Sequence, residues 1–210
     1  MGSSVAWQWG PVLPYLDLFG IAVFAATGAL SATARAQTFV TAAFFALIAG
    51  VGGGSVRDLL IDAPVFWVHD PTVAALCLAM AGLIWVTPEV WWGGKALDWL
   101  DAVGLAAYAV FGAAKALGFG VPPVPAALMG VVTACVGGII RDVLAGEPSI
   151  LMRPELYVTA AALASGLYVG LTLAGLASFA AAGIAAGAGF ALRAAAIVWH
   201  LRLPSYRGRR

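Results

Sequence analysis

Charged residues are scarce in this sequence. Only 10% of its 210 residues are charged, whereas soluble globular domains carry about 25%. Hydrophobic residues make up 62%, the mean hydropathy is +0.96 and the formal net charge is +1. This near-neutral balance leaves no basic excess for a phosphate backbone, which excludes a nucleic-acid partner. The composition also excludes a soluble or disordered chain and indicates a polytopic membrane protein.

Groups that perform chemistry are equally scarce. The two cysteines, Cys77 and Cys135, lie inside apolar runs and are expected to be buried hydrophobic side chains. His69 and His200 have no His, Cys or carboxylate at a metal-ligand spacing. The sequence also lacks a nucleophile–base arrangement, a phosphate-binding loop and a dinucleotide fingerprint. We therefore expect neither an enzyme nor a resident cofactor or metal.

The apolar residues form seven runs separated by proline and glycine. A helix needs about 20 apolar residues to cross the hydrocarbon core of a membrane. The predicted fold class is all-α, with a single transmembrane domain over 1–210 and seven transmembrane helices. The spans are expected at about 16–34, 39–61, 72–88, 99–118, 124–145, 155–174 and 177–199.

Lysine and arginine fall in alternate loops. One side holds Arg35, Lys95, Arg153 and the basic tail 200–210, and the loops of the other side have neither residue type. By the positive-inside rule this predicts a multi-pass protein of the cell (inner) membrane, surrounded by membrane lipids, with its N-terminus outside and its C-terminus cytoplasmic. All eight tryptophans lie at or near predicted helix ends, the membrane depth that an indole prefers.

One register of 84 residues relates the first three spans to the next three. The pair Leu-Asp at 16–17 recurs at 100–101, and the motif Gly-Gly-x-x-Arg-Asp at 53–58 recurs at 137–142. Each repeat has three spans, an odd number, so the second copy must enter the membrane from the opposite face. This predicts two inverted three-helix repeats, at about 12–88 and 99–174. A seventh helix with a small-residue face follows, at about 177–199.

The repeated motif places charge and glycine where a membrane helix tolerates them poorly. Arg and Asp at a helix centre each cost about 2.5–3.5 kcal/mol on the insertion scale, and each glycine about 0.8–1.0 kcal/mol against alanine. We expect the glycines to break helices two and five, so that freed carbonyls and the aspartates face a passing cation. The candidate pore and gate residues are Gly52, Gly53, Gly54, Ser55, Arg57, Asp58, Lys115, Gly137, Gly138, Arg141 and Asp142. A monovalent cation is expected to bind transiently near the backbone of Gly53, Gly54, Gly137 and Gly138.

The same charges also have structural interpretations. Each Arg-Asp pair could be a closed ion pair, or could lie near the interface at a helix end. Lys115 either extends to the outer interface or acts as a gating or charge-selecting group. Asp17 and Asp101 open their helices and are expected to be N-caps. Arg193 is expected to reach the cytoplasmic interface.

The paired motifs, the Gly-Ala pairs at 28–29 and 112–113 and the seventh span resemble a bacterial member of the trimeric intracellular cation (TRIC) channel family, over about 12–204. The resemblance implies a homotrimer with one pore in each protomer, lined by helices two and five and permeable to K⁺ and also Na⁺. It also implies that the motif residues line or gate the pore, and it associates Lys115 with gating. Animal members bind a phosphoinositide at a different basic–acidic motif on span two. The Arg-Asp form in this chain argues against that lipid.

Two functions are compatible with this pattern. The first is a passive channel for monovalent cations. The second is a secondary transporter for a small zwitterion such as an amino acid, in which each Arg would face the carboxylate and each Asp the ammonium group. A structural scaffold would leave the repeated charged motif without a reason.

Overall fold

The protein is a helical bundle whose helices follow the predicted spans closely. The computed structural model describes residues 13–93, 95–152 and 154–204. Within these ranges it has α1 (Leu13–Thr33), α2 (Phe39–Leu60), α3 (Pro71–Val86), α4 (Ala96–Gly118), α5 (Pro123–Leu144), α6 (Val158–Leu173) and α7 (Ser178–Trp199), with the short 3-10 helices η2 (Glu89–Trp92) and η3 (Ile150–Met152). Each predicted span is therefore confirmed as a helix. The N-terminal residues with two of the tryptophans, Arg153 and residues 205–210 of the basic tail lie outside the described residues.

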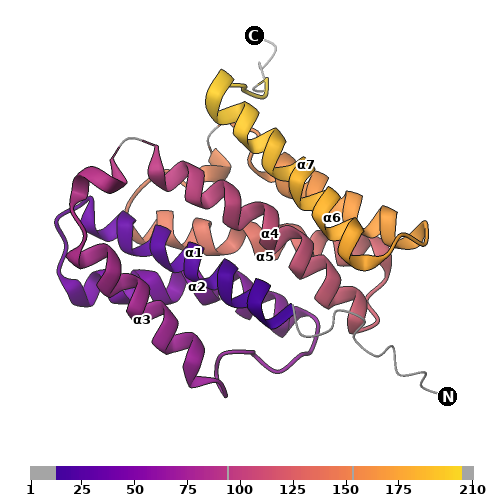
Figure 1. Ribbon diagram of the computed structural model, residues 1–210, viewed down its shortest axis with the longest axis horizontal. Coiled ribbons are helices and arrows are strands. Elements are labelled where there is room, and N and C mark those ends of the chain that lie inside the picture. The colour runs from indigo at the N-terminus through magenta and orange to yellow at the C-terminus, as the bar shows by residue number, and fades with distance from the viewer. Residues whose placement is uncertain (1–12, 94, 153, 205–210) are drawn as a thin grey trace, which may run out of the picture.

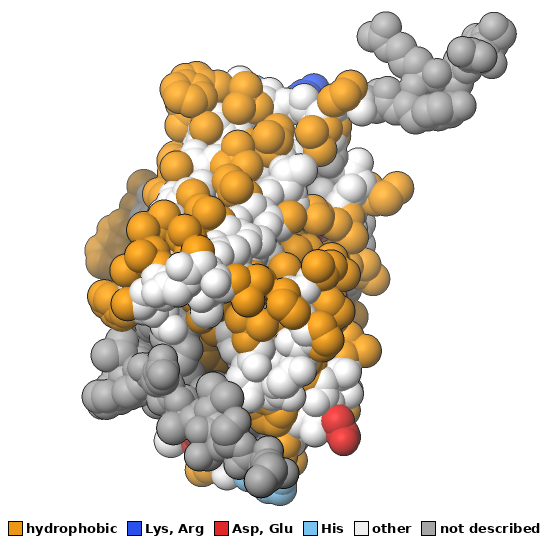
Figure 2. Space-filling view, turned by 90° about the vertical axis from the view of Figure 1, so that its right-hand side faces the viewer, with side chains coloured by type: hydrophobic (Ala, Val, Ile, Leu, Met, Phe, Trp, Pro, Cys, Tyr) orange, Lys and Arg blue, Asp and Glu red, His pale blue; other side chains and the backbone are white. Residues whose placement is uncertain are grey.

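Four of the helices are long and apolar enough to cross a membrane: α2, α4, α5 and α7. Helices α3 and α6 have 16 residues each, which is about 24 Å and somewhat less than the hydrocarbon core. On the face shown in Figure 2, hydrophobic side chains cover most of the height, and charged groups and histidine appear only toward the two ends. The chain is thus a multi-pass membrane protein.

Small residues form the contacts between helices. Figure 1 shows α1, α2, α4 and α5 together in the middle of the bundle, with α3 at one edge and α6 and α7 at the other. Association in a lipid environment depends on close van der Waals packing, which small side chains permit. Each of the seven helices carries at least one alanine without exposed surface: Ala25, Ala46, Ala81, Ala109, Ala134, Ala161 and Ala185.

The predicted breaks at the motif glycines are wrong. Helices α2 and α5 continue without interruption through both motifs, so the carbonyl groups of Gly53 and Gly54 belong to the hydrogen-bond ladder of α2. The glycines serve a close helix crossing instead. A Cβ on Gly53 would overlap the carbonyl oxygen of Thr133, and a Cβ on Gly137 would lie 2.5 Å from that of Ala49. Contact between α2 and α5 offsets the weak helix propensity of glycine.

Candidate functional site

The first motif forms a buried ion cluster between α2 and α4. Asp58 Oδ1 accepts a 2.8 Å hydrogen bond from Arg57 Nε and lies 2.7 Å from Lys115 Nζ. Asp58 Oδ2 accepts a 3.2 Å hydrogen bond from the backbone N–H of Phe66. The Asp58 side chain has no exposed surface, and those of Arg57 and Lys115 are 1% and 13% exposed. One carboxylate is therefore shared between two cations, and Lys115 points into the protein rather than to the outer interface.

Arg57 is only partly satisfied by this carboxylate. Its Nη2 atom lies 2.7 Å from Asp58 Oδ1 without hydrogen-bond geometry, and its Nη1 atom has no partner among the described residues. Aromatic rings cover both cations: Arg57 Cζ is 5.1 Å from the ring centre of Phe111, and Lys115 Nζ is 5.8 Å from that of Phe66. Such contacts contribute about 0.5–2 kcal/mol. A buried guanidinium with an open N–H can still donate to a water molecule or solute.

The second motif forms a matching cluster between α5 and α4. Asp142 Oδ1 accepts a 3.0 Å hydrogen bond from Arg141 Nε, and Asp142 Oδ2 accepts one of 3.0 Å from the backbone N–H of Ile150. Arg141 Nη1 also donates to Asp101 Oδ1 over 2.8 Å. The backbone donors Phe66 and Ile150 are 84 residues apart, as the two motifs are. The sequence repeat is therefore preserved in the contacts that its aspartates make.

The structure keeps the two clusters apart. Lys115 belongs to the first and Asp101 to the second, and they are 14 residues apart on α4, about 21 Å along the helix. Between the two clusters α2 and α5 cross in contact at Gly53 and Gly137. Gly52 lies at the same crossing, where a Cβ would be 3.7 Å from the Cα of Gly137. One charged cluster thus lies on each side of a tight helix contact.

An acidic cavity of about 240 Å³ lies beside the second cluster. Its charged lining consists of four carboxylates and two guanidinium groups, a formal charge of −2: Asp98, Asp101, Asp142, Glu147, Arg35 and Arg141. Arg35 and Glu147 form a partly exposed ion pair of 2.8 Å. Asp101 is buried, and its Oδ2 has no hydrogen-bond partner in the described structure. A concave surface with this excess of negative charge concentrates cations.

The remaining predicted residues adjoin the clusters. Ser55 Oγ accepts a 2.8 Å hydrogen bond from the indole N–H of Trp67, so this tryptophan is anchored in the protein. Gly54 makes room for Phe66, whose Cε1 atom would lie 2.7 Å from a Cβ at that position. At Gly138 a Cβ would lie 3.1 Å from the hydroxyl of Tyr157. Within the described residues, no group of three or more His, Cys, Asp or Glu side chains is placed to hold a metal ion.

The expectation that Asp17 and Asp101 cap their helices is wrong. Helices α1 and α4 begin at Leu13 and Ala96, which places both aspartates in the second turn. Asp101 pairs with Arg141 there, and Asp17 Oδ1 accepts a 3.1 Å hydrogen bond from the Tyr108 hydroxyl. Asp101 is thus a site residue that the sequence prediction missed. The sequence did single out this position, because Asp101 matches Asp17 at the 84-residue offset of the repeat.

Arg193 does not reach the interface either. Its side chain is 1% exposed, its Nη1 atom lies 2.8 Å from Glu155 Oε2, and its guanidinium carbon lies 5.2 Å from the ring centre of Tyr157. This ion pair ties α7 to the segment that leads into α6. No sequence pattern links these residues, since they come together only when α7 packs on the bundle.

We expect Glu155→Gln to destabilise the protein more than Arg193→Met does. The first change leaves a buried guanidinium without its counter-charge, which costs about 3–5 kcal/mol. The second removes the buried charge itself and leaves a carboxylate that is 36% exposed. Thermal unfolding in detergent measures the difference. The matched control is Glu147→Gln at the partly exposed pair with Arg35, for which about 0–1 kcal/mol is expected. Equal effects at the two pairs would contradict the prediction.

Comparison with known proteins finds a transporter family model and relatives that are named as membrane proteins. The family model described as Glycine transporter matches residues 14–89 and 98–172. The chain is 37% identical to the UPF0126 inner membrane protein YadS of Escherichia coli K12 over 200 residues, covering 91% of this chain and 95% of that protein. A UPF0126 membrane protein of Vibrio cholerae is 35% identical, with coverage of 93% and 83%.

Solved structures with the same fold are TRIC channels. The TRIC orthologue from Rhodobacter sphaeroides superposes with a TM-score of 0.84 at 40% identity, covering 90% of this chain and 99% of that one. A second structure, described under the words "Structural basis for conductance through TRIC cation channels", matches with a TM-score of 0.82 at 25% identity. The match covers 94% of this chain and 98% of that one. None of these relatives is named as an enzyme.

Proposed function

The chain is a prokaryotic member of the trimeric intracellular cation channel family and of the sequence family described as Glycine transporter, and from this membership we propose that it is a passive channel for K⁺ and Na⁺. It is a membrane transport protein and not an enzyme. The pathway runs through each protomer along α2, α5 and α4. It passes the two ion clusters and the crossing at Gly53 and Gly137.

The observation that carries this proposal is the pair of buried ion clusters. Charged side chains inside membrane segments are costly and commonly mark ion pathways. Here six such groups gather on three helices: Arg57, Asp58 and Lys115 in one cluster, and Asp101, Arg141 and Asp142 in the other. Arg57 Nη1 and Asp101 Oδ2 have no protein partner in the described structure. Groups left open in this way suit water and ions that pass between the helices.

The geometry supports a closed conformation. Lys115 is bound to Asp58, and the α2–α5 contact leaves no room for even a methyl group at Gly53. Cations gather in the acidic cavity beside Asp101 and Asp142. They pass when α2 and α5 separate and Lys115 moves away from Asp58. The glycines therefore act by letting two intact helices close on each other, and not through freed carbonyls.

The assembly follows from the same membership. Each protomer of a homotrimer would hold its own pathway, and α7 with its small residues could pack within or between protomers. The 84-residue offset between matching contacts supports two inverted repeats. The distribution of lysine and arginine supports an inner-membrane orientation with the C-terminus in the cytoplasm.

Reconstituted protein tests the function. Liposomes that contain it are expected to release K⁺ down its gradient, and single-channel recordings to show a preference for cations over Cl⁻. Asp142→Asn should reduce that preference, because it removes a negative charge from the acidic cavity and leaves Arg141. Asp62→Asn, an exposed position after α2, should leave it unchanged. Absence of ion flux, with both variants identical to the parent, would overturn the proposal.

The same preparation tests the alternative. The alternative is a transporter, which the name of the matching family model suggests. In it Arg57 and Arg141 would face a carboxylate, and Asp58 and Asp142 an ammonium group. That function predicts saturable uptake of labelled glycine and no unitary currents. Unitary currents that persist without any amino acid would exclude it, and saturable uptake alone would exclude the channel.

A further inference from the structure

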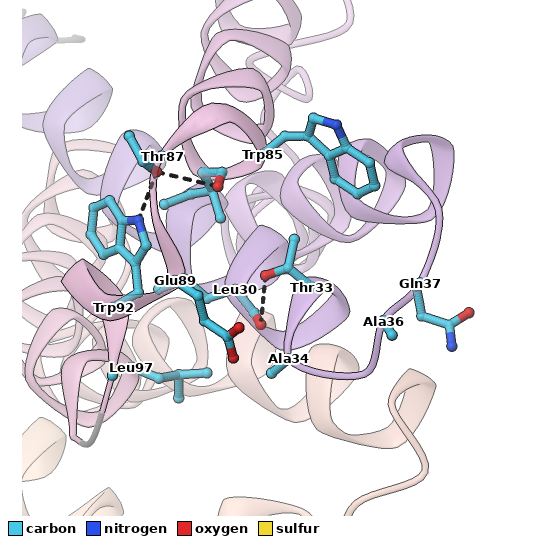
Figure 3. Close-up of a pocket in the computed structure, with 12 residues that line it drawn as sticks. Leu30, Thr33, Ala34, Ala36, Gln37, Trp85, Thr87, Glu89, Trp92 and Leu97 are labelled. Atoms are coloured by element: carbon cyan, nitrogen blue, oxygen red, sulfur yellow. Dashed lines mark hydrogen bonds between the residues drawn. The ribbon is translucent and has the colours of Figure 1, made fainter.

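A cavity of about 670 Å³ lies at the ends of α1 and α3, apart from both ion clusters. It is bounded by the last turn of α1 and the turn that follows it, by the end of α3, by η2 and by Leu97 at the start of α4. Figure 3 shows Trp92 and Trp85 on two sides of it, with the Glu89 carboxylate between Trp92 and Ala34. Neither sequence motif contributes to this cavity.

The protein itself holds both indole rings in place. Trp92 Nε1 donates a 2.7 Å hydrogen bond to Thr87 Oγ1, which donates one of 2.7 Å to the carbonyl of Leu83. Trp85 packs edge to face on Phe39, with 5.7 Å between ring centres. An interfacial anchor directs its indole N–H to lipid headgroups, whereas Trp92 directs it into the protein. Trp92 is therefore a lining residue whose indole is held in place by the protein.

The charge of the described lining of this cavity is negative. Glu89 is the only ionisable side chain in the described lining. Helix α3 ends at Val86, beside the cavity, and the C-terminal end of a helix carries a partial negative charge. The end of α1 adds less, because the Arg35 guanidinium donates a hydrogen bond to the carbonyl of Ser31 in its last turn. Apolar side chains, among them Leu30 and Ile84, form much of the remaining wall.

We propose that this cavity binds an organic cation with an alkyl-substituted ammonium group. An indole face attracts such a group, and recognition of quaternary ammonium ions by aromatic side chains depends on this attraction. The Glu89 carboxylate balances the charge, and the apolar walls cover the alkyl substituents. A hydrated inorganic cation would gain nothing from those walls. The ammonium group can belong to a zwitterionic lipid or to a free amine, because the chemistry recognised is the same.

This site is separate from the cation pathway but adjoins it. Leu97 lines both this cavity and the acidic one, and the last turn of α1 borders both. Binding of an ammonium ligand does not require conduction. A binding measurement therefore tests the site independently of the proposed channel function.

Choline is the probe for a titration with the full-length protein in nanodiscs made of phosphatidylglycerol, which lacks an ammonium group. We expect saturable binding of choline, and at least tenfold weaker binding of 3,3-dimethylbutanol, its neutral isostere. Glu89→Gln and Trp92→Leu should each weaken choline binding about tenfold. Trp91→Leu is the matched control, because Trp91 lies next to Trp92 on η2, is 68% exposed and does not line the cavity.

The lipid of the nanodisc distinguishes the two sources of ligand. If phosphatidylcholine competes with added choline, the site takes a lipid headgroup; if it does not, the site takes a free amine. Both results support the proposal. Equal binding of choline and its neutral isostere would overturn it, as would equal effects of Trp92→Leu and Trp91→Leu. Thermal unfolding of each variant checks that a lost signal is not lost folding.

Discussion

Asp58→Asn is expected to destabilise the protein by about 3–5 kcal/mol, because it leaves two buried cations without their shared carboxylate. Arg57 and Lys115 both lie 2.7 Å from Asp58 Oδ1, and each is largely inaccessible to water. An asparagine can still accept the backbone hydrogen bond of Phe66, so the loop after α2 has a partner. The loss of stability therefore measures the removal of the Asp58 charge and not the loss of this hydrogen bond. Thermal unfolding in detergent measures it.

Two further variants isolate the electrostatic cause. Asp62→Asn makes the same chemical change at an exposed site just beyond α2 and should have little effect. The double variant Asp58→Asn with Lys115→Met removes one unpaired cation and should recover a substantial part of the lost stability, as a double-mutant cycle would reveal. If Asp58→Asn behaved like Asp62→Asn, the first cluster would not be the closed ion pair that the structure indicates.

Gly137→Ala is expected to separate α2 from α5. The new Cβ would lie 2.5 Å from the carbonyl oxygen of Ala49, and a backbone atom cannot move aside as a side-chain tip can. We expect a net destabilisation of about 1–3 kcal/mol from overpacking, measured by thermal unfolding. If this crossing is the closed constriction, the same substitution should also raise the resting K⁺ flux.

Gly166→Ala supplies the matched control for this substitution. Gly166 lies within α6, and a Cβ there would meet nothing within 4 Å. With no clash, the better helix propensity of alanine should stabilise the protein by up to about 1 kcal/mol. The two substitutions should therefore shift the unfolding temperature in opposite directions. Shifts of the same sign and size would show that propensity, and not the α2–α5 contact, explains the glycines.

The sequence predicted the helices well because their signal is local. Each long apolar run between prolines and glycines had to become a helix, since a membrane leaves backbone groups no other partner. The 84-residue repeat also survived into the structure, where Asp58 and Asp142 each accept a backbone hydrogen bond from the residue eight positions later. Hydropathy within one helix and repetition at a fixed offset can both be recognised from the sequence alone.

The predictions that were wrong all concerned residues whose partners lie on other segments of the chain. Glycine lowers helix propensity, so three in a row indicated a break, but propensity says nothing of a neighbouring helix that needs the space. Asp101 lies near the start of the predicted span at 99 and was therefore expected to cap the helix. In the structure α4 begins at Ala96, so Asp101 lies within the helix. Arg193 lies near the end of its span and was expected to reach the membrane interface. In the structure its guanidinium is buried and contacts Glu155 and Tyr157.

The sequence by itself determined that this is a seven-helix membrane protein with a duplicated charged motif, because hydropathy and repetition are properties of the chain. Only the tertiary structure decided what the motif does. In it the helices are continuous, the motif glycines of α2 and α5 lie at a close helix contact, and the charges form two clusters about 21 Å apart along α4. The physical reason is that a buried charge is defined by its counter-ion, and each cluster draws a charged residue from another helix: Lys115 for Asp58, and Asp101 for Arg141.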